Sequence, residues 1–161
     1  MVRSGVVASI GVLFALVSSG CTEDGPTLSD VAPMFERDAP EIFEDLVERT
    51  ARNPDGATIV DDGTSDVACA DGQVKREFEG SFPIQDEPDL DDKLDLYTSV
   101  VWSELSRRSY EGNWPPNQAD AVDLRELTTT NADETIRFTV RFAGKPTPSL
   151  TFLGETNCLR P

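Results

Sequence analysis

Three cysteines have the most distinctive chemistry in this chain of 161 residues: Cys21, Cys69 and Cys158. Cysteine reacts as a thiolate nucleophile, and two cysteines in an oxidising compartment can form a disulfide. The chain contains no histidine, which excludes Ser-His-Asp and Cys-His catalysis, most transition-metal sites and the usual proton shuttle near neutral pH. The cysteines therefore indicate covalent attachment or cross-linking rather than catalysis.

The segment before Cys21 has the organisation of an export signal. Arg3 and the terminal amine form a short positive region, an apolar run occupies residues 6–17, and the first acidic residue is Glu23. An apolar run of about a dozen residues has the length found in signal peptides and is shorter than the roughly 20 residues needed to span a bilayer. The sequence therefore predicts a leader over residues 1–20. An ordinary secretory signal and a signal anchor are the alternatives.

The motif Ser18-Ser19-Gly20-Cys21 resembles the bacterial lipobox, in which small residues precede a cysteine that is lipidated and becomes the mature N-terminus. The position that usually holds a large aliphatic residue is Ser18 here, with Val17 one place earlier. The resemblance covers residues 1–21. It implies that Cys21 carries a diacylglycerol thioether, with palmitate among its acyl chains, and holds the protein on the extracytoplasmic side of the cell membrane. More than one acyl chain makes such anchoring stable.

Lipidation of Cys21 would leave Cys69 and Cys158 as a pair. Exported compartments are oxidising, so we expect a disulfide between them, with two separate buried thiols as the alternative. Cys69 lies between Asp66 and Asp71, and this acidic setting disfavours the thiolate that a redox role requires.

The strongly acidic composition excludes several classes of partner. The chain has 14 Lys and Arg residues against 30 Asp and Glu residues, for a net charge of −16. Such a surface repels nucleic-acid phosphate, so we expect no DNA or RNA binding. It also repels anionic head groups, so a covalent lipid is a better membrane tether than electrostatic attraction.

Apolar periodicity predicts two helices after a tether over residues 21–28. The first runs from Ser29 to the Asn53-Pro54 turn. The second starts at Asp89, has Arg107 and Arg108 in its last turn, and ends at Gly112. We expect Pro40 to kink or split the first helix, with Asp38 capping its second half. Alternating patterns predict strands over residues 57–61, resuming over 67–70, then over 74–84, 122–128, 135–143 and 150–155, those before residue 84 forming a hairpin.

The order α-β-β-α-β-β-β predicts a single α+β domain over residues 29–161. Consecutive strands favour antiparallel pairing, so we expect two layers: an antiparallel sheet of about five strands with two helices on one face. Six phenylalanines at periodic positions are the predicted core: Phe35, Phe43, Phe78, Phe82, Phe138 and Phe142.

Two groups of acids could bind calcium. In the group over residues 86–95, Lys93 and Leu94 stand where an EF-hand loop counted from Asp89 needs an acid and a glycine, so acids that stabilise a helix start are the favoured interpretation. The acids at positions 61, 62 and 66 surround Gly63, and a turn explains them equally well. We therefore predict no metal site and no cofactor.

Two further features could contact a ligand or partner. Trp114, beside two prolines, is a possible partner or glycan contact, although a buried anchor is the commoner role of such a residue. Arg137 and Arg141 share one strand face and could bind an anion, but ion pairing with Asp123 or Glu126 is the simpler expectation. A carboxylate pair of a glycosidase has no specific signal among 30 acids.

These observations favour a membrane-anchored cell-envelope lipoprotein that acts as a non-enzymatic interaction module for an envelope protein or wall component. A binder of a small ligand or calcium is the alternative, and a carboxylate-dependent hydrolase comes third. The layout also loosely resembles small actinobacterial lipoproteins of uncharacterised role. That resemblance carries over no functional residue beyond Cys21 and the possible Cys69–Cys158 pair.

Overall fold

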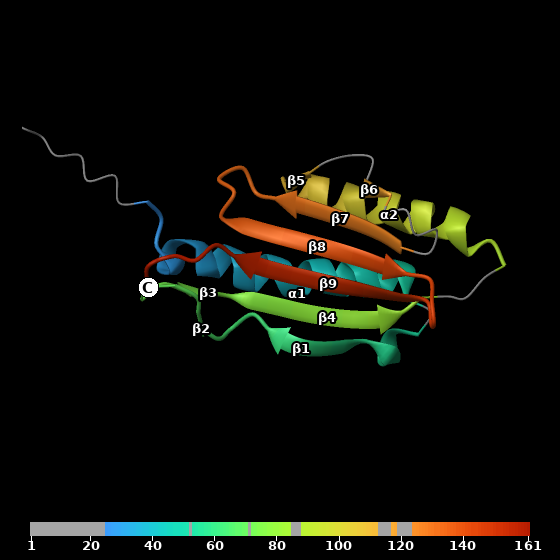
Figure 1. Ribbon diagram of the computed structural model, residues 1–161, viewed down its shortest axis with the longest axis horizontal. Helices are drawn as coiled ribbons and strands as arrows, with labels where there is room; N and C mark the ends of the chain where they lie inside the picture. Colours follow the sequence, from blue (N-terminus) through green and yellow to red (C-terminus); the bar gives the residue numbers. More distant parts are fainter. Residues whose placement is uncertain (1–24, 52, 71, 85–87, 113–116, 119–123) are drawn as a thin grey trace, which may run out of the picture.

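The computed structural model describes residues 25–51, 53–70, 72–84, 88–112, 117–118 and 124–161 (Figure 1). Cys21 with its leader, and Trp114, lie outside the described residues, so the predictions that concern them are not addressed by the fold. Helices α1 (Leu28–Thr50) and α2 (Leu90–Arg107) both lie on one face of an antiparallel sheet. The predicted α+β class and two-layer arrangement are confirmed.

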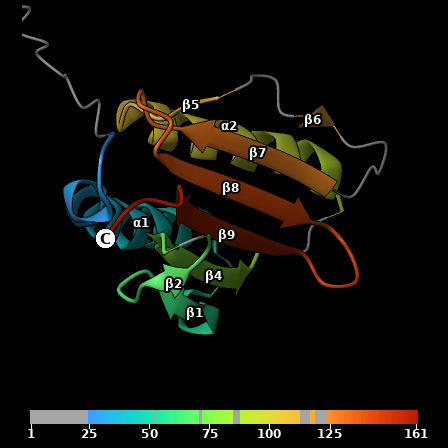
Figure 2. The same ribbon diagram turned by 60° about the vertical axis from the view of Figure 1, so that its left-hand side comes forward.

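Five longer strands form the body of the sheet. In spatial order they are β1 (Thr58–Asp62), β4 (Glu77–Pro83), β9 (Ser149–Thr156), β8 (Ile136–Ala143) and β7 (Leu124–Thr130). The two-residue strands β5 (Glu111–Gly112) and β6 (Asn117–Gln118) both pair with β7, beyond the five strands that were expected. The strand nearest the C-terminus therefore lies in the middle of the sheet, between β4 and β8 (Figure 2).

The predicted hairpin is present, with one interruption. Strands β2 (Val67–Ala68) and β3 (Val74–Lys75) pair with each other and continue the β1–β4 hairpin toward its tip. The predicted strand over residues 74–84 is divided at Arg76, whose backbone N–H donates to Thr156 Oγ1 at 3.0 Å. The Arg76 guanidinium lies 3.0 Å from Asp66 and 3.4 Å from Glu36, so this residue fastens the hairpin to α1.

The predicted aromatic core is confirmed, with Phe152 of β9 added to it. The seven phenylalanine side chains among the described residues are at most 2% exposed: Phe35, Phe43, Phe78, Phe82, Phe138, Phe142 and Phe152. Phe43 of α1 contacts three rings of the sheet, with centroid distances of 5.6 to 6.2 Å. A Cβ on Gly80 would lie 2.6 Å from the Phe43 ring, so a glycine in β4 is what lets α1 approach this closely.

Of the two outcomes expected at Pro40, a kink or a split, the split is wrong. Helix α1 is continuous from Leu28 to Thr50, with Pro33 and Pro40 inside it. Proline in a helix interior costs about 3 kcal/mol, but burying one large apolar side chain contributes about 1.5–3 kcal/mol. Phe35, Ile42 and Leu46, on both sides of Pro40, are fully buried. Their combined burial outweighs the proline and holds one helix across the sheet.

Asp38 does not cap a helix, which corrects a second prediction. It lies in the middle of α1, is only 5% exposed, and accepts a hydrogen bond from the Tyr110 hydroxyl at 2.7 Å. Burial and this hydrogen bond raise the pKa of Tyr110 above its usual range. The pair joins α1 to the segment after α2.

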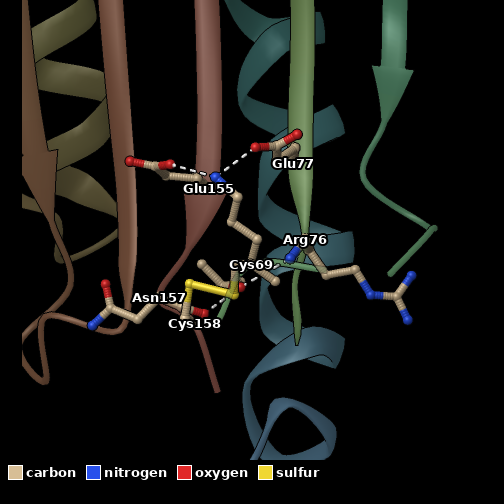
Figure 3. Close-up of a disulfide and its surroundings, with 8 residues drawn as sticks. Cys69, Arg76, Glu77, Glu155, Asn157 and Cys158 are labelled. Atoms are coloured by element: carbon tan, nitrogen blue, oxygen red, sulfur yellow. Dashed lines mark hydrogen bonds and ion pairs between the residues drawn. A yellow bond between two sulfur atoms is a disulfide. The ribbon is translucent and has the colours of Figure 1, made fainter. Parts of the chain in front are cut away.

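One end of the molecule gathers the first described residues, the hairpin tip and the C-terminus. The Leu28 N–H donates to the Arg160 carbonyl at 2.7 Å, and Val74 and Leu159 exchange two backbone hydrogen bonds of 2.9 Å. Cys69 and Cys158 form a disulfide with a Cα–Cα distance of 6.0 Å (Figure 3). The expected cysteine pairing is therefore present, and it ties the chain just after β9 to the hairpin.

Removing the disulfide should destabilise the domain without changing its fold. Because Cys69 and Cys158 are 89 residues apart in sequence, their cross-link lowers the conformational entropy of the unfolded chain. This stabilises the folded state by about 4–5 kcal/mol. We expect the Cys69→Ala/Cys158→Ala variant to lose free energy of unfolding on that order in urea titrations. Reductant should lower the melting temperature of the wild type and leave the variant unchanged. An equal response of the two proteins would contradict this role.

Candidate functional site

Strand β1 forms one edge of the sheet and is brought there by a tight turn. The turn starts at Asn53, whose side chain accepts from the Asp55 N–H at 3.2 Å, and Pro54–Gly56 forms a single 3-10 turn, η1. Among the described residues, β1 pairs with β4 alone. Its register shifts between Ile59 and Asp61, which places a bulge at Val60. Bulges are typical of sheet edges, where they bend the strand.

Two large aliphatic side chains are exposed on this edge. Ile59 is 51% exposed and Val60 is 73% exposed. Most of the described aliphatic and aromatic side chains are buried or half-buried; the third large one exposed is Leu96 of α2, at 53%. Adjacent apolar residues on an edge strand mark a surface that can bind another molecule.

Ile59 lines a groove between β1 and α1. The groove has a volume of about 360 Å³, and its other apolar lining residues are Phe43, Val47, Pro54 and Ala57. Glu44 and Glu48, one helical turn apart on α1, complete the lining. The groove therefore combines an apolar lining with two carboxylates.

Val60 lines a second depression, on the face of the sheet that carries no helix. This depression has a volume of about 420 Å³ and extends from β1 across to β8; it is lined by Val60, Asp61, Glu77, Phe78, Glu79, Arg137, Thr139, Arg141, Leu153, Gly154 and Glu155. Strand β1 thus separates two hollows, an apolar one on the helix side and a charged one on the open side.

The basic side chains of the open face are held by neighbouring acids. Lys75 lies 2.6 Å from Glu77 and 3.4 Å from Glu155. Figure 3 shows these two carboxylates in the surroundings of the disulfide. Arg137 pairs with Glu155 at 3.2 Å, and Arg141 pairs with Glu126 on β7. The expected pairing of Arg141 with Glu126 is confirmed, while Asp123 lies outside the described residues. The arrangement is a ladder of ion pairs rather than an anion site.

A second set of charges joins the two helices. Glu104 of α2 is only 2% exposed, and its carboxylate lies 3.0 Å from Arg108 and 3.6 Å from Arg49 of α1. Arg108 also reaches Asp45 of α1 at 2.9 Å, and this hydrogen bond lowers the pKa of Asp45. A buried carboxylate surrounded by guanidinium groups is satisfied as a helix-to-helix contact.

The predicted acidic groups do not assemble into a cation site in the part of the chain that is described. Asp61 and Asp62 accept hydrogen bonds from backbone N–H groups of the following turn, at 3.0 Å each. Asp66 pairs with Arg76, and Asp95 pairs with Arg125 at 2.9 Å. No three potential ligands gather there to hold a metal ion.

Sequence reasoning missed the β1 surface. The Ile59-Val60 pair was recognised only as part of a strand, because nothing local to residues 57–61 indicates that the strand lies at an edge. The two consecutive aspartates that follow, at positions 61 and 62, were the available signal, since charged residues are common on exposed edges.

Comparisons with known proteins found no match. No protein-family model, curated protein or solved structure matches this chain. Within the described ranges, neither helix has the length and apolar character required to cross a bilayer.

The helix-to-helix charges should make stability depend on acid pH. The folded-state pKa of Asp45 lies below its ordinary value of 3.8 because Arg108 donates a hydrogen bond to it. Its contribution is therefore present above about pH 4 and is lost as the pH falls through the folded-state pKa. We expect Asp45→Asn to lower the free energy of unfolding by on the order of 1 kcal/mol at pH 7.

Urea titrations at pH 7 and pH 3 test this expectation. The difference between the wild type and Asp45→Asn should shrink at the lower pH. Asp92→Asn, which changes an exposed carboxylate on α2, should have a smaller effect at pH 7. A difference for Asp45→Asn that stays constant with pH would contradict the ion-pair assignment.

Proposed function

We propose that this chain is an extracytoplasmic lipoprotein, held on a membrane through Cys21, that acts as a non-enzymatic interaction module. Its contact surface in this proposal is the β1 edge surface, defined as β1 together with the groove lined by Phe43, Val47 and Ile59. The observation that carries the proposal is the exposure of Ile59 and Val60, at 51% and 73%, on a strand that no other described strand covers on its outer side.

The position of the β1 edge surface along α1 supports the proposal. The described chain enters α1 at Leu28, next to Arg160 and at the end where the disulfide lies. At 1.5 Å per residue, Phe43 and Val47 lie roughly 22–29 Å farther along the helix. A tether attached before Leu28 would leave this surface away from the attachment point, where a partner can reach it.

The ion pairs that the charged groups form within the molecule also support a binding role for the apolar edge. Glu104, Arg108 and Asp45 serve the contact between the helices, and the Arg137 and Arg141 side chains pair with acids on neighbouring strands. These groups are held by one another. Ile59 and Val60, which are adjacent in the β1 edge surface, would gain stability by burial against another molecule.

Membrane attachment is tested by replacing the lipidated cysteine. We expect the Cys21→Ala variant to lose stable membrane anchoring and to be recovered in the soluble fraction if the leader is cleaved, because the residues after the leader include no apolar run. Fractionation with blotting measures this, together with mass spectrometry of the wild-type N-terminus for the acyl chains. A wild-type N-terminus without lipid would contradict lipidation, and membrane-bound uncleaved mutant would indicate a signal anchor.

The interaction surface is tested by site-specific photo-cross-linking in cells. A photoreactive residue in place of Val60 should give one discrete cross-linked species, because this side chain is exposed at the proposed contact. The matched control is the same residue in place of Leu96, which is comparably exposed on α2 and should not give that species. Identical products from the two positions, or none from position 60, would contradict the proposal.

A further inference from the structure

Strand β1 has an outer side that can accept another strand. Its five residues pair with β4 on one side, at Thr58–Ser81, Ile59–Gly80, Asp61–Glu79 and Asp62–Phe78. No described strand pairs with the other side, and Figure 1 shows β1 as the outermost strand of the sheet. An edge strand presents backbone N–H and C=O groups in a row, and an extended peptide can pair with them as an added strand.

The groove beside β1 selects the side chains of such a strand. Successive side chains of an added strand would point alternately to the helix side and to the open side. On the helix side they meet Phe43, Val47 and Ile59, which line the apolar groove. On the open side they meet Val60, Asp61 and Glu79. The two sides thus favour apolar residues in alternation with polar or charged ones.

The charged residues around β1 determine which sign of charge a bound segment should carry. The groove contains Glu44 and Glu48, and β1 itself contributes Asp61 and Asp62. The basic groups that share the open-face depression, Arg137 and Arg141, are paired with Glu155 and Glu126. A positively charged segment is therefore attracted to this edge, and an acidic segment is repelled.

A second copy of this chain is a poor occupant. Two β1 strands side by side would bring two sets of Glu44, Glu48, Asp61 and Asp62 together, between chains that each carry a net charge of −16. Like charges placed opposite each other on paired strands are destabilising. The two consecutive aspartates of β1 are charges of the kind that natural edge strands use against self-association.

We propose that β1 is a docking strand for an extended segment of another protein in which apolar residues alternate with Lys or Arg. The segment adds to the sheet beside β1, with its apolar side chains in the groove lined by Phe43, Val47 and Ile59. The inference rests on the proposed interaction function and names the partner's chemistry.

Binding of designed peptides to the full chain, purified from membranes in detergent, tests the docking strand. The probe is a fluorescent peptide of alternating valine and lysine that exceeds β1 by one residue at each end. We expect it to bind with an affinity that falls as salt rises, because exposed charges are screened. A peptide with glutamate in place of lysine should not bind measurably. A valine-lysine peptide N-methylated on alternate residues should bind at least tenfold more weakly, since it lacks the backbone N–H donors along one edge of the strand.

A charge-reversed pair of variants locates the binding surface. Glu44→Lys/Glu48→Lys should weaken binding of the valine-lysine peptide by tenfold or more. The matched control is Asp92→Lys/Glu111→Lys, which makes the same change in net charge at exposed positions on α2 and on β5, at the opposite side of the sheet. The control should bind as the wild type does, and circular dichroism of both variants should match the wild type.

Three results would overturn the docking strand. The first is equal loss of binding in the two double variants, which would indicate attraction to net charge alone. The second is undiminished binding of the N-methylated peptide. The third is a wild-type dimer that buries β1. A discrete cross-link from position 60 without binding of the valine-lysine peptide would refute the partner chemistry and leave the interaction module standing. Tight binding of the valine-lysine peptide without a cross-link from position 60 would refute the interaction module in cells and leave the binding chemistry of the β1 edge standing.

Discussion

The central position of β9 is the constraint on which this structure depends. Strand β9 pairs with β4 along seven residue pairs and with β8 along eight, and it is the one connection through the sheet between the β1–β4 hairpin and the β7–β8 hairpin. Leu150 and Phe152 are fully buried under the helices. A Cβ on Gly154 would lie 2.8 Å from the Phe138 ring, so this strand also sets how closely the core packs. Cys158 then fixes the end of β9 to Cys69.

Three groups of charged residues have different surroundings. Between the helices, Glu104 is buried and its arginine partners hold α1 against α2. On the open face, ion pairs run across neighbouring strands. Around β1, Glu44 and Glu48 line an apolar groove instead. The first two groups stabilise the sheet and its helices, whereas the third lies beside the edge that we propose as the binding surface.

The sequence was most informative where structure is local. Alternation identified the strands that became β8 and β9 within one residue at each end, and it predicted β3 and β4 as a single strand, because period-two burial is visible in any half-buried strand. Helical spacing identified α1 and α2 because the buried face of a helix repeats about every 3.6 residues. The prediction failed at Pro40 because a local rule about proline takes no account of the burial of Phe35, Ile42 and Leu46 against the sheet.

The candidate site could not be predicted in the same way. Whether a strand is central or at an edge depends on partners that are distant in the chain, so β9 and β1 carried similar local signals and have opposite positions. The exposure of Ile59 and Val60 follows from that position, and so does the groove against Phe43. The burial of Glu104 likewise requires knowing that Arg49 and Arg108 converge on it from two helices.

The order of strands in the chain also determines how this domain can be assembled. Synthesis runs from the N-terminus, so the β1–β4 hairpin, both helices and the β7–β8 hairpin all exist before residues 149–156 do. Until those residues arrive, β4 and β8 each expose an unpaired edge beside buried phenylalanines, the kind of intermediate that associates with other chains. Completion of the sheet by its last strand is therefore a single late step. It converts two incomplete halves, open to wrong partners, into one body with β1 at one edge.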